Sequence, residues 1–218
     1  MLLYELIVAF SYSVVIAMTI GLVRLGKILR AYRPFVFILI LSFLGELLNT
    51  FMALYYKTNA VSANVYVLFE CYLWLWQFQS WGTFKKKPSH LWLLVCALTT
   101  VWMVEHIWMQ KIWSFSSIFR ISYAFVLVFL CIDQLNRMIV NERKNLLRTS
   151  RFLICLGIVF FYSYKIMVET FYLFELDLSM AFYSYLYNIL VCMNLFVNLV
   201  FALAALWIPT RQRFTLQS

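Results

Sequence analysis

The stretch from residue 180 to residue 207 reads MAFYSYLYNILVCMNLFVNLVFALAALW and contains no charged residue, no proline and no glycine. A helix needs about 20 consecutive apolar residues to cross a bilayer, so this stretch is long enough for one crossing. Six similar stretches precede it, and the seven lie roughly at residues 4–23, 35–55, 62–82, 91–109, 112–133, 152–174 and 180–207. Backbone polar groups within lipid need internal partners, so each stretch is expected to be a helix. We therefore predict an all-α membrane protein, a seven-transmembrane helix bundle formed by one domain of residues 1–218.

The composition excludes the soluble and disordered classes. The chain is 65% hydrophobic and 12% charged, whereas soluble domains average about 45–50% apolar and about 25% charged residues. Proline is tolerated at the start of a helix and just after its end. Pro34 and Pro88 precede or open predicted helices and Pro209 follows the last one, so the prolines support these boundaries.

The basic residues predict the orientation of the bundle. The net charge is +9, and most of the 18 Lys and Arg residues fall in the connections after the first, third and fifth stretches or after the seventh. By the positive-inside rule, the N-terminus is outside and the C-terminus is cytoplasmic, in a plasma membrane or a bacterial inner membrane. We expect these residues to contact the anionic headgroups of the lipid bilayer. No nucleic-acid partner is expected, because the connections are too short to form a folded basic domain.

The first three and last three stretches share one layout around the fourth. One shift of the sequence places Phe35 on Phe152, Ser62 on Ser179 and Tyr66 on Tyr183. This layout resembles the 3+1+3 parallel repeat of SWEET sugar exporters and PnuC-type vitamin-precursor transporters, although their sequence motifs are absent.

Short motifs give a second resemblance. They are Gly45-Glu46, Asn64-x-Tyr66-x-x-x-Glu70, Gly157 with Tyr162, and Asn194-x-x-x-Asn198. With these motifs the chain resembles a group of uncharacterised small seven-helix membrane proteins of the Bacteroidota type. The resemblance implies the seven-helix fold and no known activity.

Ionisable side chains inside the stretches are the strongest functional signal, because such groups are costly in lipid and usually face the bundle interior. At helical spacing they form polar stripes with neighbouring amides and phenols. The candidate ligand-binding residues on these stripes are Glu46, Asn49, Tyr66, Glu70, Lys165, Glu169, Tyr187 and Asn194. Lys165 and Glu169 are four residues apart, a spacing that allows an ion pair. Alternatively, the stripes only hold the helices together through interhelical hydrogen bonds.

These residues favour a polar site near the membrane midplane that binds a small polar or cationic solute, for transport. A receptor or sensor that signals to a cytoplasmic or membrane partner is an alternative, as is a structural subunit of a membrane complex. An enzyme is the least supported class, because no nucleophile–base pair is apparent. We expect no metal centre and no cofactor, since the two histidines, His90 and His106, are far apart in sequence. A homo-oligomer or a complex with a membrane protein is compatible with the sequence.

Overall fold

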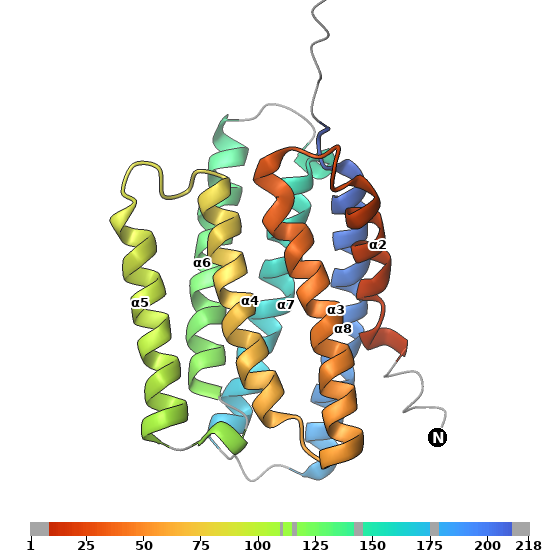
Figure 1. The fold of residues 1–218 in the computed structure, drawn as a ribbon, viewed down its shortest axis with the longest axis vertical. Helices are drawn as coiled ribbons and strands as arrows, with labels where there is room; N and C mark the ends of the chain where they lie inside the picture. Colours follow the sequence, from red (N-terminus) through yellow and green to blue (C-terminus); the bar gives the residue numbers. More distant parts are fainter. Residues whose placement is uncertain (1–8, 110, 115–116, 142–145, 175–178, 211–218) are drawn as a thin grey trace, which may run out of the picture.

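The computed structural model describes residues 9–109, 111–114, 117–141, 146–174 and 179–210, and these residues form helices and no β-strand. The long helices run side by side in one bundle (Figure 1). Their bounds are α2 Val14–Arg24, α3 Arg33–Tyr56, α4 Ala60–Ser80, α5 Ser89–Met103, α6 Ser117–Asn141, α7 Ser150–Leu173 and α8 Met180–Trp207. The all-helical prediction is confirmed for the described residues.

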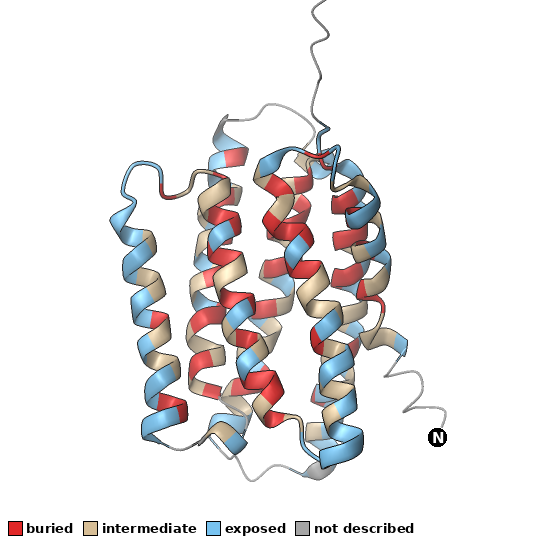
Figure 2. Cartoon of the chain, in the orientation of Figure 1, coloured by how far each residue is buried: buried red, intermediate tan, exposed pale blue. Residues whose placement is uncertain are grey.

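Six of these helices form a closed ring. Contacts run from α2 to α3, α4, α6, α7 and α8 in turn, and α8 packs back against α2. Helix α5 stands outside the ring against α4 and α6, at the edge of the bundle in Figure 1. Burial agrees with this placement, because Leu98 is the one buried residue of α5, which is mostly tan and pale blue in Figure 2.

Five helical segments are long and apolar enough to cross a membrane, which indicates a multi-pass integral membrane protein. They are Arg30–Tyr56, Ser89–Trp108, Ser117–Val140, Ser150–Leu173 and Ala181–Trp207. Helix α4 has the length but not the hydropathy, because Asn64, Glu70 and Gln77 lie within it and are buried in the bundle. Helix α2 belongs to a shorter apolar segment, Ala9–Arg24, and residues 4–8 of the first predicted crossing lie outside the described residues. The count of seven crossings stays a prediction.

Most predicted boundaries lie within a few residues of the observed helices, but α6 differs at both ends. It was expected at residues 112–133 but begins at Ser117 and ends at Asn141. The early part of the predicted stretch is a 3-10 turn, Lys111–Trp113, that precedes the helix. The helix continues past the apolar stretch, where Asp133 and Arg137 form an i,i+4 ion pair at 2.8 Å. Such a pair stabilises the turns that follow the apolar stretch, where Gln134, Asn136 and Arg137 interrupt the hydrophobic pattern.

Hydrogen bonds fix both ends of several helices. The buried side chain of Gln77 accepts from the Phe35 N–H at 2.7 Å and donates to the Ala31 carbonyl at 2.7 Å, which attaches the start of α3 to α4. At the same end of the bundle, the Arg24 guanidinium donates to the carbonyls of Ala205 at 2.7 Å and Ile208 at 3.0 Å. A helix C-terminus leaves carbonyls without helical partners, so Arg24 joins the end of α2 to the end of α8.

The connections rich in basic residues share one end of the bundle. The chain turns at this end between α2 and α3, between α4 and α5, and between α6 and α7, and α8 also finishes there (Figure 1). Lys27 and Arg30 lie in the first of these connections, and Lys85 to Lys87 lie in the second. Arg143 and Lys144 of the third lie outside the described residues. The up-and-down path of the helices therefore places the predicted basic groups together, at what is called the basic end below.

Candidate functional site

A cavity of about 490 Å³ lies at the centre of the helix ring. Side chains from α2, α3, α4, α6, α7 and α8 line it, and none of its lining residues belongs to α5. Seven of the eight candidate residues from the sequence line this one cavity: Glu46, Asn49, Tyr66, Glu70, Lys165, Tyr187 and Asn194. The predicted polar stripes thus converge from separate helices, as a binding site requires.

Glu70 is held by two tyrosines. Its Oε1 accepts a hydrogen bond from the Tyr66 hydroxyl at 3.0 Å, and its Oε2 accepts from the Tyr123 hydroxyl at 2.6 Å. The Tyr66 hydroxyl also lies 3.2 Å from the hydroxyl of Ser42 on α3. Because phenol donors to both oxygens compensate a buried carboxylate for lost water, Glu70 is fixed in one orientation at the cavity wall.

Lys165 lies within an aromatic cage. Its Nζ is 5.5 to 5.7 Å from the ring centroids of Tyr123, Phe161 and Tyr162. These distances are within the range at which a ring face attracts a cation. Within the described part of the chain, no carboxylate oxygen lies within 4.0 Å of this amine. The amine therefore faces the cavity among three aromatic rings, without a direct ion pair.

Glu46 has a different environment from Glu70. Among the described residues it forms no hydrogen bond and no ion pair, and its side chain lines the cavity. Asn49, one helical turn further along α3, accepts a hydrogen bond from the Ser62 hydroxyl at 2.7 Å. Glu46 is thus the acidic group with oxygens available to a ligand, while Glu70 is already bonded.

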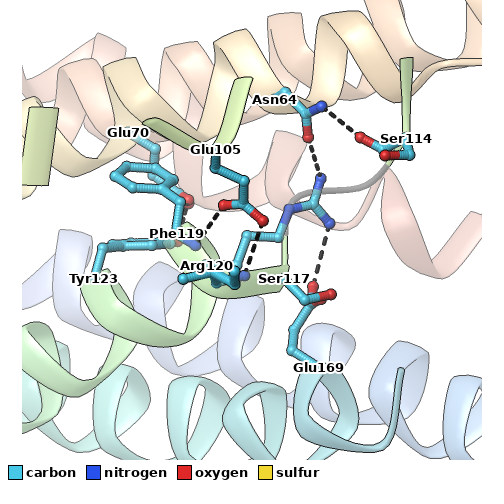
Figure 3. Close-up of polar contacts among 10 residues, drawn as sticks. Asn64, Glu70, Glu105, Ser114, Ser117, Phe119, Arg120, Tyr123 and Glu169 are labelled. Carbon is cyan, nitrogen blue, oxygen red and sulfur yellow. Dashed lines mark hydrogen bonds and ion pairs between the residues drawn. The ribbon is translucent and has the colours of Figure 1, made fainter. Parts of the chain in front are cut away.

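Glu169 does not line the cavity and does not pair with Lys165, contrary to the i,i+4 expectation. Its Oε1 lies 3.2 Å from Nη1 of Arg120, and its Oε2 accepts a hydrogen bond from the Ser117 hydroxyl at 2.9 Å. Figure 3 shows Arg120 reaching between Glu169 on α7 and Asn64 on α4. An arginine fork fits a carboxylate better than a single ammonium does, which favours this partner. Glu169 therefore belongs to a contact between helices.

Glu105 also has a structural role. Its two oxygens accept hydrogen bonds from the backbone N–H groups of Ile118 at 3.1 Å and Phe119 at 2.7 Å (Figure 3). These N–H groups belong to the first turn of α6, where no helical acceptor exists. A carboxylate at this end is also favoured by the helix dipole. Glu105 therefore anchors the outer helix α5 to the ring.

The charges that line the cavity do not balance. Lining residues that ionise are Glu46, Glu70, Arg120 and Lys165. Since Arg120 is paired with Glu169 outside the cavity, two carboxylates face one remaining amine, Lys165. Buried charge in a low-dielectric site needs compensation, so the cavity is suited to one additional positive charge, brought by a proton or by a cation.

Aromatic side chains form the floor of the cavity toward the basic end. The ring centroids of Phe35 and Phe201 are 5.4 Å apart, and those of Trp74 and Phe201 are 6.2 Å apart. All three residues are buried, and the Trp74 indole donates to the Tyr162 hydroxyl at 3.2 Å. The opposite part of the lining reaches Asn59, in the connection between α3 and α4. The cavity therefore extends toward the end opposite the basic end and is blocked on the other side.

The part of the cavity wall formed by α8 is polar because it carries two asparagines. The Asn198 amide donates to the Ser13 hydroxyl at 2.8 Å and, at 3.5 Å, to the side-chain oxygen of Asn194. Both asparagines line the cavity, as predicted for Asn194. This part of the polar stripe joins α8 to the segment before α2, so it both packs helices together and presents amides to the cavity.

Sequence reasoning missed the aromatic partners of the charged residues. Tyr123 is fully buried and binds Glu70, yet no pattern singled it out, since one tyrosine on an apolar helix resembles core packing. Its position three residues after Arg120 on α6 is a signal that could have found it. Tyr162 is part of a short motif in the sequence but was not among the predicted site residues. Its position three residues before Lys165 places both on one face of α7.

Among the residues that the structure describes, no group of three or more His, Cys, Asp or Glu side chains is arranged to hold a metal ion. Comparison with known proteins found no matching family model, no matching curated protein and no matching solved structure. The cavity and its residues are therefore the basis for assigning a function.

Proposed function

We propose that the central cavity binds a small cationic or polar solute and that the protein transports it across the membrane. The unbalanced charge of the cavity wall supports a cationic solute, because two carboxylates, Glu46 and Glu70, face a single unpaired amine. In this proposal Glu46 contacts the cation directly. Glu70 attracts the cation electrostatically from its fixed position, and Tyr187 and Asn194 orient the solute.

The shape of the cavity supports transport. Its lining extends toward one end of the bundle, while Phe35, Trp74 and Phe201 block the basic end. Alternating access requires a site that opens to one side at a time, and this shape fits one such state. With all seven helices crossing and the basic end in the cytoplasm, the open side faces outward. A plasma membrane or a bacterial inner membrane is the proposed location.

Two charge substitutions in the cavity test the binding site, because they should change cation affinity in opposite directions. Isothermal titration of the protein in lipid nanodiscs with methylammonium or tetramethylammonium measures cation affinity. Glu46→Gln removes one attractive charge, and at an effective dielectric constant of about 20 a charge about 5 Å away contributes about 3 kcal/mol. We therefore expect affinity to fall at least tenfold. Lys165→Met removes a repulsive charge and is expected to raise affinity about tenfold or more.

Asp133→Asn is the matched control, because it removes a carboxylate from the exposed basic end of α6, outside the cavity. Its affinity should equal that of the unchanged protein. Uptake of labelled methylammonium into proteoliposomes then tests transport, and Glu46→Gln should reduce it in proportion to binding. The proposal fails if Glu46→Gln and Asp133→Asn have the same effect on binding, or if Lys165→Met weakens it.

A further inference from the structure

A second hollow lies on the outer surface of the bundle between α3 and α4. This apolar groove has a volume of about 570 Å³ and is lined by residues that include Leu44, Leu48, Val65 and Phe69, all of which are exposed. None of its lining residues is charged. In a bilayer, this surface faces acyl chains, which are as apolar as the groove itself. The groove therefore accommodates a hydrocarbon chain, but its apolar lining does not favour one hydrocarbon chain over the acyl chains of the bilayer.

The groove and the central cavity share a wall that is one side chain thick. Tyr66 lines both spaces. Its hydroxyl is bonded to Glu70 within the cavity, and its ring lies so close to Gly45 that a Cβ there would fall 2.5 Å from Tyr66 Cδ2. Because Gly45 has no side chain, only the Tyr66 ring separates the two spaces at this point.

The polar edge of the groove also meets the cavity. Ser62 lines the groove, and its hydroxyl donates at 2.7 Å to Asn49, which lines the cavity. The apolar and polar spaces therefore adjoin at two hydrogen-bonded contacts, Tyr66 to Glu70 and Ser62 to Asn49. A ligand that occupies both spaces needs a hydrocarbon part on one side and a cationic part on the other.

We propose that the solute is a single-chain amphiphile with a cationic headgroup, which enters sideways from the bilayer between α3 and α4. The headgroup binds in the cavity beside Glu46, and the chain remains in the groove. Tyr66 is the portal between them, and its ring turns away from Gly45 to admit the headgroup. This inference rests on the proposed function, because the charge of the cavity selects the headgroup, and it adds the chain and the lateral route.

Photolabelling with two probes tests the proposal. One probe is a tetradecylammonium with a diazirine near the end of its chain, and the other is an uncharged methyl ether with the same chain and diazirine. Each is irradiated with the protein in phosphatidylcholine nanodiscs, and adducts are mapped by mass spectrometry. We expect the cationic probe to label groove residues at least fivefold more than the exposed face of α8, and the ether to label both faces equally.

Variants assign this labelling to the headgroup site and to the groove. Glu46→Gln should reduce groove labelling by the cationic probe at least fivefold, whereas Asp133→Asn should not change it. Val65→Trp fills the groove from an exposed position and should also reduce it, whereas Leu203→Trp, at an exposed position on α8, should not. Size-exclusion chromatography of each variant is the control for correct folding. Val65→Trp tests the groove without altering a charged group.

The outcomes separate the two proposals. If tetramethylammonium binds in a Glu46-dependent manner but the cationic probe labels the groove and α8 equally, the amphiphile inference is wrong and the cation site stands. If tetramethylammonium binding does not depend on Glu46, the proposed function itself is wrong. Groove labelling that is the same for both probes, or that Glu46→Gln leaves unchanged, also overturns the inference.

Discussion

The ion pair between Arg120 and Glu169 predicts a large difference between two superficially similar substitutions. Both side chains of this pair are 11% exposed, and the nearest atoms are 3.2 Å apart. Arg120→Met leaves the buried Glu169 carboxylate with the hydrogen bond from the Ser117 hydroxyl. Removing one partner of a buried pair costs about 3–5 kcal/mol, because the other charge is left uncompensated. We expect Arg120→Met to lower the free energy of unfolding by about 3 kcal/mol.

The second ion pair of the described residues is the control. Asp133 and Arg137 are closer, at 2.8 Å, but their side chains are 45% and 52% exposed. Exposed pairs contribute about 0–1 kcal/mol, because water solvates either partner alone. Arg137→Met should therefore lower the free energy of unfolding by less than about 1 kcal/mol, although its pair has the shorter distance.

Reversible unfolding by dodecyl sulfate in mixed micelles, followed by circular dichroism, measures both effects. The double variant Arg120→Met/Glu169→Met removes both charges and should lie within about 1 kcal/mol of the unchanged protein, as apolar replacements of buried pairs often do. The reasoning is refuted if Arg120→Met is no more destabilising than Arg137→Met. It is also refuted if the double variant is as unstable as Arg120→Met alone.

Three further predictions concern packing and helix ends. Gly45→Ala should lower the thermal unfolding midpoint, at a cost of about 1–3 kcal/mol for overpacking against Tyr66, whereas Gly26→Ala, with no atom within 4 Å of the added Cβ, should not. Gln77→Leu should cost about 2–4 kcal/mol in denaturant titration, because the buried Phe35 N–H of α3 and the partly buried Ala31 carbonyl before it lose their partner. Glu105→Ala should accelerate amide hydrogen exchange at Phe119, with Glu105→Gln intermediate; equal exchange in all three proteins would contradict its capping role.

The helices and the cavity residues were largely predictable, because burial in lipid leaves strong patterns in sequence. A crossing must be predominantly apolar over about 20 residues, so α3, α7 and α8 lie within a few residues of their predicted ranges. Polar residues repeated at helical spacing must share a face, so Glu46 and Lys165 on separate helices were both assigned to one interior site, which the cavity lining matches.

The partners of these residues could not be predicted in the same way. Helical spacing within α7 suggested that Glu169 pairs with Lys165, whereas the rotation of α6 beside α7 brings Arg120 to Glu169 instead. Relative rotation depends on packing between helices, which a pattern within one helix does not specify. The final turns of α6 were missed for a related reason, since they lie beyond the apolar stretch and begin at the ion pair of Asp133 and Arg137.

The closed ring has a consequence for how the protein is made. The first and last helices of the ring, α2 and α8, complete the wall of the cavity, so the polar side chains of α3 and α4 are synthesised well before their enclosure exists. The hairpin formed by α3 and α4 already pairs Tyr66 with Glu70 and Ser62 with Asn49. These two helices can therefore leave the insertion machinery together with several of their polar groups already bonded, whereas Glu46 is enclosed only when the last helix arrives.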